Sequence, residues 1–237
     1  TRCSRDWSSD VCSSDLFVTA TGTDIGKTFV TAGLIRHLRR LGHKVDAFKP
    51  VLSGFEMDGA KASDAGQLLA ALEQNVTLET LDRMAPWRFT APLSPDIAAA
   101  HEKRSIDFQA LVSACRVKAA DRHHTLFIEG VGGVMVPLDA RHTVLDWMVE
   151  LNIPVILVTG SYLGTISHTL TALSVLSAHN LNIRAVVVNE TPGGVSMDET
   201  MATIGRFAPG IPLCPLSRTT RQDVVDEAMA TLWRAVA

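Results

Sequence analysis

The sequence predicts an α/β fold in which a mostly parallel β-sheet is flanked by helices. Short runs rich in β-branched residues alternate with segments of helical periodicity. Several runs, such as 155–159, are apolar without alternation, as in strands buried on both faces. With 237 residues, of which 46% are hydrophobic and 20% charged, the chain can bury the core of one globular domain. We therefore expect a single domain over residues 17–237, with right-handed crossovers.

Each predicted strand is a short run rich in Val, Ile, Leu or Phe, bounded by turn-forming or polar residues. The predicted strands are 16–20, 45–48, 125–129, 155–159, 185–189 and 211–214.

The predicted helices lie between these strands and carry their apolar residues on one stripe. Gly42 and Asn180 are suitable helix stops. The segment 84–95 is rich in proline and aromatic residues, and we expect it to be irregular. The predicted helices are 27–41, 64–72, 107–121, 144–151, 164–179, 197–207 and 221–236.

The first sixteen residues differ from the rest of the chain. They are rich in Ser, Asp and Cys and show no periodicity. The string DWSSDVCSSDL, residues 6–16, can be back-translated into a short-read sequencing adaptor. We therefore expect residues 1–16 to be a non-native or disordered tail, in which Leu16 substitutes for a native residue of the first strand.

Composition excludes several classes of partner. The net charge is −3, without a long basic or acidic block, so neither nucleic acid nor an anionic membrane surface is indicated. Apolar runs such as 153–158 are far shorter than the roughly 20 residues that span a bilayer. No signal segment begins the chain, and we expect a cytoplasmic protein with small ligands. Four cysteines have neither metal-ligand nor redox spacing: Cys3, Cys12, Cys115 and Cys214.

The most informative motif is Gly-Thr-Asp-Ile-Gly-Lys-Thr at 22–28, between a predicted strand and a predicted helix. Glycine lets backbone N–H groups approach phosphate oxygens, Lys27 supplies a positive charge, and the Thr28 hydroxyl can bind Mg²⁺. The strict pattern would place glycine at position 21, where the chain has Thr21, so a glycine-rich turn with an incidental lysine is the alternative. The motif predicts a P-loop that binds ATP.

Further polar residues follow other predicted strands, and ligands of parallel sheets gather beyond the carboxyl ends of the strands. Lys49 follows the strand 45–48 and is either a solvated lysine or a catalytic one. Glu129 ends the strand 125–129 and precedes a glycine turn, where a carboxylate can bind Mg²⁺. Asp64 begins a predicted helix and is either a first-turn acid or a second metal ligand.

From residue 17 to about residue 217 the chain resembles the dethiobiotin synthetase family of ATP-dependent enzymes. FVTATGTDIGKT resembles the phosphate loop of that family, FKPVLSG its substrate-lysine segment, ASDAG its metal aspartate and IEGVGG its metal glutamate. GSYLGTISHTL resembles the stretch near the substrate and dimer interface, and VVNETP the segment whose asparagine reads adenine. Each motif is common by itself, but together and in this order they are specific. The phosphate loop departs from the family at Ala20 and Thr21, where glycine is commoner.

The resemblance implies that 7,8-diaminononanoate captures CO₂ as a carbamate, that ATP phosphorylates the carbamate, and that the second amine closes a cyclic urea. It also implies a homodimer, because the substrate carboxylate in this family lies against the partner subunit. Cationic groups are needed to neutralise two anionic reactants. The implied catalytic residues are Lys27, Lys49 and Thr23, and the implied substrate-binding residues are Ser53, Leu163, Gly164 and Thr165.

The resemblance further implies the residues that hold ATP and Mg²⁺. His168 is expected to pack or to form hydrogen bonds rather than to act in catalysis. Mg²⁺ would be bound by Thr28, Asp64 and Glu129. The implied nucleotide-binding residues are Asp24, Ile25, Gly26, Lys27, Thr28, Phe29, Asp64, Glu129, Gly130, Val131, Gly132, Asn189, Glu190, Pro215, Leu216 and Ser217.

Two other functions are kept as alternatives. One is another ATP-dependent amide-forming ligase, although such relatives usually carry extra domains. The other is a partition-type P-loop ATPase, a nucleotide-driven switch that places a second lysine where this chain has Gly22. The partition-type class also usually adds a basic or amphipathic membrane element, which the sequence does not show.

Overall fold

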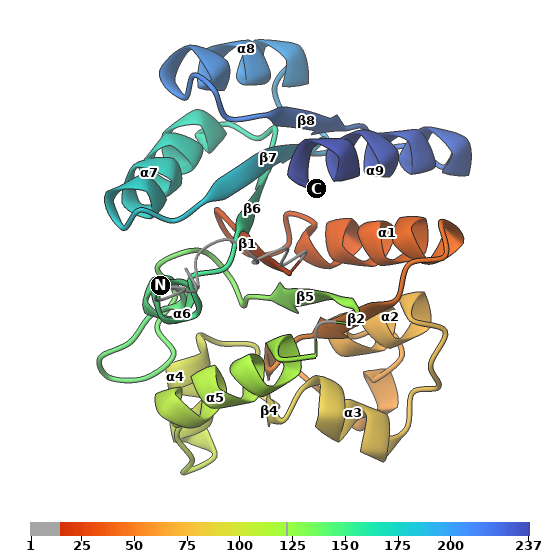
Figure 1. Cartoon of the computed structure of the whole chain (residues 1–237). Helices are drawn as coiled ribbons and strands as arrows, with labels where there is room; N and C mark the ends of the chain where they lie inside the picture. Colours follow the sequence, from red (N-terminus) through yellow and green to blue (C-terminus); the bar gives the residue numbers. More distant parts are fainter. Residues whose placement is uncertain (1–14, 122) are drawn as a thin grey trace, which may run out of the picture.

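The centre of the molecule is a sheet of six parallel strands, seen in Figure 1. The structure is a computed structural model that describes residues 15–121 and 123–237. The strand order is β2-β5-β1-β6-β7-β8, and every neighbouring pair is parallel. The strands are β1 (Leu16–Ala20), β2 (Val45–Phe48), β5 (Thr125–Glu129), β6 (Val155–Gly160), β7 (Ile183–Asn189) and β8 (Leu213–Leu216). The prediction of a mostly parallel sheet flanked by helices is confirmed.

Helices cover both faces of this sheet, with α1 and α9 on one side and α6 and α7 on the other (Figure 1). The strands between them are buried on both faces, which explains their continuous apolar runs. On the first face lie α1 (Lys27–Arg40), α2 (Asp64–Ala71), α3 (Leu78–Met84) and α9 (Gln222–Val236). On the second lie α4 (Pro95–His101), α5 (Phe108–Ala119), α6 (Val144–Leu151), α7 (Thr165–Ala178) and α8 (Met197–Phe207).

The helix ends follow local chemistry that the sequence contains. Thr143 and Asp146 form a capping box at the start of α6, so its predicted bounds are confirmed. Gly42 and Asn180 have φ angles of 82° and 56° just beyond α1 and α7, a left-handed conformation that ends a helix. Both predicted helix stops are therefore confirmed.

The prediction that 84–95 is irregular is wrong at one place. Trp87–Phe89 forms β4, which pairs in parallel with β3 (Val51–Ser53) as a separate two-stranded sheet. Three-residue strands are too short to show a period, and their pairing depends on contacts between distant segments. The helices α3 and α4 and the 3₁₀ turn Met57–Gly59 are also absent from the predicted elements, since two turns or fewer show little helical periodicity. The strand predicted at 211–214 is observed two residues later, at Leu213–Leu216.

Most of the predicted tail, residues 1–14, lies outside the described residues. Asp15 and Leu16 are described and are 6% and 2% exposed. Leu16 begins β1, and the backbone N–H of Leu126 donates to the Asp15 carboxylate at 3.0 Å. The non-native origin of residues 1–16 and the domain boundary at 17 stay predictions.

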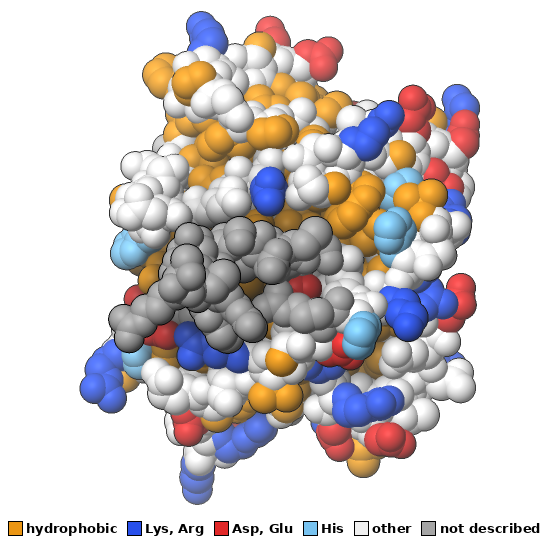
Figure 2. Space-filling model, in the orientation of Figure 1, with side chains coloured by type: hydrophobic (Ala, Val, Ile, Leu, Met, Phe, Trp, Pro, Cys, Tyr) orange, Lys and Arg blue, Asp and Glu red, His pale blue; other side chains and the backbone are white. Residues whose placement is uncertain are grey.

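The surface agrees with the even charge balance of the sequence. Figure 2 shows basic and acidic side chains interspersed around the visible face. Within residues 15–121 and 123–237, no helix combines the length and the apolar character needed to span a membrane.

Candidate active site

A cleft of about 920 Å³ lies at the carboxyl ends of β1, β2 and β5. Because the strands are parallel, the loops that follow them meet at one edge of the sheet. The volume is in the range of small-molecule sites. Its lining includes the predicted residues Thr23, Asp24, Gly26, Lys27, Thr28, Phe29, Lys49, Ser53, Asp64, Val131 and Gly132.

Lys27 is held at one side of this cleft by the turn between β1 and α1. Gly26 precedes it with a φ angle of 97°, and a Cβ at Gly26 would lie 2.2 Å from Asn189 Nδ2, so only glycine suits this position. Lys27 Nζ donates to the carbonyl oxygens of Gly22 at 3.1 Å and Gly132 at 2.9 Å. The ammonium group therefore joins the loop after β1 to the loop after β5.

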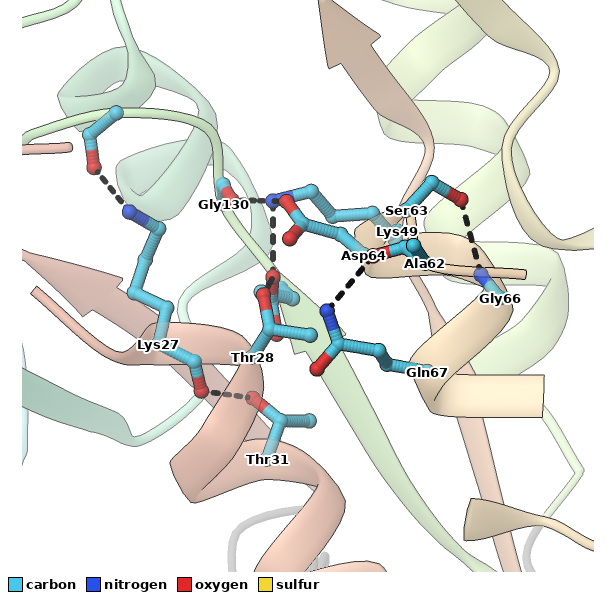
Figure 3. A network of polar contacts seen from close by, with 12 residues as sticks. Lys27, Thr28, Thr31, Lys49, Ala62, Ser63, Asp64, Gly66, Gln67 and Gly130 are labelled. Carbon is cyan, nitrogen blue, oxygen red and sulfur yellow. Dashed lines mark hydrogen bonds and ion pairs between the residues drawn. The ribbon is translucent and has the colours of Figure 1, made fainter. Parts of the chain in front are cut away.

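A second buried cation, Lys49, lies between two acids (Figure 3). Lys49 Nζ is 2.9 Å from Glu129 Oε1, 3.2 Å from Asp64 Oδ2 and 2.6 Å from the Gly130 carbonyl oxygen. Thr28 Oγ1 donates to the same Glu129 oxygen at 2.8 Å. Lys49 is 1% exposed and Glu129 is fully buried. Four residues that are far apart in the sequence thus meet at one point.

The electrostatics of the two lysines differ. Burial, together with the nearby charge of Lys49, lowers the pKa of Lys27 to about 8. Burial would also lower the pKa of Lys49, but the carboxylates of Glu129 and Asp64 outweigh burial and raise that pKa. Burial would raise the pKa of Asp64, whereas the Lys49 charge keeps it below its usual range. The site thus holds Lys49 and Asp64 in their charged forms.

The residues beside Lys49 fit a hard divalent cation. Glu129 Oε2 is buried and has no hydrogen-bond partner, although its other oxygen has two. Asp64 and the Thr28 hydroxyl bring further oxygen ligands to the same point. In the described part of the chain no three His, Cys, Asp or Glu residues cluster as a complete metal cage. Two carboxylates and a hydroxyl suit Mg²⁺, which keeps several water ligands.

The predicted adenine-side residues lie next to the phosphate loop but outside the cleft lining. Asn189 Nδ2 donates to the Ile25 carbonyl oxygen at 3.0 Å, which places the end of β7 against that loop. The backbone N–H of Glu190 donates to the Leu216 carbonyl oxygen at 2.9 Å. The structure therefore groups Asn189, Glu190, Pro215 and Leu216 at the ends of β7 and β8, with Ser217 following.

The predicted substrate residues divide into two places. Ser53 lines the cleft, and its buried Oγ has no hydrogen-bond partner in the described structure. Leu163, Gly164 and Thr165 do not line it. Leu163 is 89% exposed, and Thr165 is buried and donates to the Gly160 carbonyl oxygen at 2.6 Å. Within one chain, the structure does not bring 163–165 to the cleft.

Sequence reasoning missed part of the cleft wall. Gln67 lies one helical turn after Asp64 and could have been found from that spacing. Leu52, Gly54, Ala62 and Ser63 lie within the motifs FKPVLSG and ASDAG but were not assigned a role. The remaining residues belong to segments without a recognisable motif, mostly the stretch expected to be irregular. The missed lining residues are Leu52, Gly54, Ala62, Ser63, Gln67, Pro92, Leu93, Ser94, Pro95 and Val136.

Together these features define a P-loop NTPase: a parallel sheet in which the turn after β1 leads into α1 and faces an acid at the end of β5. Solved structures agree on the fold. The cell division ATPase MinD of Pyrococcus furiosus has a TM-score of 0.56 at 16% identity, covering 94% of this chain and 98% of that one. The MinC:MinD complex of Aquifex aeolicus has a TM-score of 0.54 at 11% identity, covering 93% of each chain.

The chain belongs to the ATP-dependent dethiobiotin synthetase family. The family model described as AAA domain matches residues 14–215. The ATP-dependent dethiobiotin synthetase BioD of Methylobacterium nodulans is 50% identical over 207 residues, covering 85% of this chain and 92% of that protein. The protein of the same name from Acidiphilium cryptum is 46% identical over 201 residues, covering 84% and 90%.

Proposed function

We propose that the chain uses ATP and Mg²⁺ to carboxylate 7,8-diaminononanoate with CO₂ and close it to dethiobiotin, a step of biotin biosynthesis. The observation that carries this proposal is that Lys27, Lys49 and Asp64 line one cleft beside the phosphate loop, with the buried Glu129 paired to Lys49 behind it. Membership of the dethiobiotin synthetase family supports the choice of substrate.

The proposed reaction has three bond-forming steps. A neutral amine of the substrate attacks CO₂ and releases a proton, which leaves a carbamate. A carbamate oxygen attacks the γ-phosphorus of ATP, and ADP leaves. The second amine attacks the carbamate carbon, inorganic phosphate leaves, and the cyclic urea closes. The second step joins two anions, so it requires cations along the line of attack.

The two lysines suit this second step. Lys27 lies between the loops after β1 and β5, where its charge would span the nucleotide phosphates and the carbamate. Lys49 would hold the carbamate or its phosphorylated form, and burial of its ammonium in the cleft strengthens the interaction. Thr23 and Ser53 line the same cleft and would donate hydrogen bonds to the reacting oxygens.

Thr28, Asp64 and Glu129 would hold Mg²⁺, and the unpartnered Glu129 Oε2 supports this assignment. When bound, the ion neutralises phosphate charge. Asn189 would pair with the adenine edge, with Glu190 and the backbone of 215–217 beside it. The remaining nucleotide contacts would come from 24–29 and 130–132, which lie at the loops already described.

We propose that the protein is cytoplasmic and forms a homodimer. The second subunit of the dimer would complete the diamine site. The exposed Leu163 and the adjoining Gly164 and Thr165 lie away from the cleft of their own chain. A partner subunit would bring its copy of this segment to the substrate. Backbone N–H groups at the start of α7 have no side-chain cap, which suits a substrate carboxylate.

The test uses purified protein with ATP, Mg²⁺, ¹³C-bicarbonate and diaminononanoate. Mass spectrometry should detect a ureido product that carries one labelled carbon. Phosphate should be released only when the diamine and CO₂ are both present. Phosphate release without the diamine, and without a ureido product, would instead support a partition-type switch.

A further inference from the structure

A chain of hydroxyl groups joins the phosphate loop to the start of α7. Its centre is Thr159, near the end of β6. Thr159 Oγ1 is 3.1 Å from Thr21 Oγ1, 2.9 Å from Thr165 Oγ1 and 2.8 Å from Thr169 Oγ1. Thr159 and Thr169 are fully buried, and Thr165 is 1% exposed. The cluster thus connects three elements: the loop after β1, the end of β6 and the first turns of α7.

The direction of these hydrogen bonds follows from the number of protons available. A threonine hydroxyl has one proton to donate and two lone pairs. Thr165 donates its proton to the Gly160 carbonyl oxygen at 2.6 Å, so Thr159 must donate to Thr165. Thr21 and Thr169 must then both donate to Thr159. The one proton and both lone pairs of the Thr159 hydroxyl are therefore used.

The same cluster extends to the exposed part of the segment. The Tyr162 hydroxyl is 3.5 Å from Thr21 Oγ1 and 2.9 Å from His168 Nδ1. The proton of Thr21 is directed to Thr159, so Thr21 can only accept from Tyr162. The bond between Tyr162 and His168 joins α7 to its preceding loop, and a hydrogen-bonding role of His168 is expected from the sequence.

Position 159 does not need a hydroxyl for packing. A valine has nearly the same shape and suits a buried strand, whereas a buried hydroxyl is costly unless it is hydrogen-bonded. The loop that follows is fixed at Ser161 to the segment after β7, since Ser161 N–H donates to Thr191 Oγ1 at 3.0 Å and its carbonyl oxygen accepts from Val195 N–H at 2.7 Å. These bonds do not reach the phosphate loop, and beyond them Leu163 is 89% exposed and Gly164 has a φ angle of 96°. The hydroxyl cluster is therefore a principal link between this loop and the phosphate loop.

We propose that Thr159 is a positioning residue that sets the place of segment 160–165 relative to the phosphate loop. The inference rests on the proposed function, in which this segment contributes to the diamine site of a dimer. Thr159 is fully buried and does not line the cleft. It acts through Thr165 and Gly160 on one side and through Thr21 on the other.

The test compares the steady-state kinetics of Thr159→Val and Thr159→Ser with those of the wild-type protein. Thr159→Val should raise the KM for diaminononanoate about tenfold, the effect of losing one or more hydrogen bonds, and change the KM for ATP less than about twofold. Thr159→Ser keeps the hydroxyl and should restore the diamine KM to within about threefold. The matched control is Thr200→Val, which removes a buried hydroxyl that donates to the Ser196 carbonyl oxygen at 2.7 Å in α8.

Three results would overturn the inference alone: an unchanged diamine KM in Thr159→Val, failure of the serine to restore it, or the same KM change in Thr200→Val. If Thr159→Val does not fold, Thr21→Val serves instead, because Thr21 is only partly buried. It should raise the diamine KM, and a rise confined to the ATP KM would contradict the inference. A wild-type protein that forms no dethiobiotin would overturn the proposed function and this inference with it.

Discussion

At the carboxyl ends of β2 and β5 the buried side chains are charged, whereas at the carboxyl end of β6 they are neutral hydroxyls. Lys49 and Glu129 are buried as an ion pair with Asp64 at the rim. Thr159, Thr165 and Thr169 are buried as a hydrogen-bonded cluster. Both groups are costly to bury unless each polar atom has a partner. The charged group still has a free carboxylate oxygen, so it is prepared for a ligand. The proton and both lone pairs of the Thr159 hydroxyl are already in hydrogen bonds, which suits a structural link.

This contrast predicts that changes in the charged group affect turnover, whereas changes in the hydroxyl group affect substrate affinity. The largest effect is expected for Lys49→Gln. Loss of a cation that stabilises phosphoryl charge should lower the rate constant of the chemical step by about 100- to 1,000-fold, measured in a single-turnover assay. Lys118→Gln is the matched control, since Lys118 also pairs with an acid, Asp46, at 3.1 Å but lies away from the cleft.

Stability must be measured in the same variant. Lys49 pairs with the fully buried Glu129, and removal of one partner of a buried ion pair can cost about 3–5 kcal/mol. Urea unfolding will show whether folded protein remains, and the double variant Lys49→Gln/Glu129→Gln restores charge balance. Near-normal turnover in folded Lys49→Gln would place Lys49 in a structural role. The charged group would then not differ from the hydroxyl group in its effect on turnover.

The second prediction concerns the free carboxylate oxygen. Glu129→Gln keeps the shape but removes the negative charge, so the Mg²⁺ concentration for half-maximal activity should rise about tenfold or more. Glu150→Gln is the control, because Glu150 is a surface acid paired with Arg116. The measurement is a Mg²⁺ titration of phosphate release. An unchanged Mg²⁺ titration would show that Glu129 does not bind the metal and has a structural role through its bonds to Lys49 and Thr28.

The third prediction tests the contact between β7 and the phosphate loop. Asn189→Ala removes the hydrogen bond to the Ile25 carbonyl oxygen and the proposed adenine contact. The KM for ATP should rise about fivefold to tenfold, and the preference for ATP over GTP should fall. Asn182→Ala, at an exposed position just before β7, is the control. Retained nucleotide preference in Asn189→Ala would place adenine recognition elsewhere.

The smallest effect is expected far from both groups, at the ion pair of Arg40 and Asp226 between α1 and α9. The hydrogen bond from Arg40, followed by that from Gln222, lowers the pKa of Asp226 to about 2. Since this pKa is lower in the folded state, its stabilisation is present above pH 3.8 and is lost as the pH falls toward 2. The Arg40 side chain is half exposed and that of Asp226 is 29% exposed, so solvent screens the pair and Asp226→Asn should cost less than about 1 kcal/mol at pH 7.

Urea unfolding at pH 7 and pH 3, with and without 1 M salt, measures this effect. The difference between wild type and variant should shrink at the lower pH and at the higher salt concentration. A difference that is independent of both would show that Asp226 stabilises the helix pair by packing rather than by charge.

Several elements were predictable because their signals are local. The strands at 16–20, 45–48 and 125–129 have the predicted bounds, as do the helices at 144–151 and 197–207. Their apolar runs, caps and glycines act over a few residues. β3 and β4 were not predictable, because two three-residue strands are defined only by their pairing with each other.

The sites divide in the same way. The motif at 22–28, Lys49, Asp64 and Glu129 were identified from residue type and position at strand or helix ends, and the structure brings these four sites together. The wall residues Pro92, Leu93 and Val136 carry no motif. The hydroxyl cluster was missed because threonine is common in strands and helices, and its partners lie up to 141 positions apart.

The sequence by itself determined the parallel α/β architecture, the phosphate loop and the charged residues, since periodicity and glycine-rich turns are properties of neighbouring residues. Only the tertiary structure decided that Lys49 is buried between two acids, that one oxygen of Glu129 has no partner and that Thr159 joins two loops. The reason is physical: hydrogen bonds and ion pairs form over about 3 Å, and only folding brings residues so far apart in the chain to that distance.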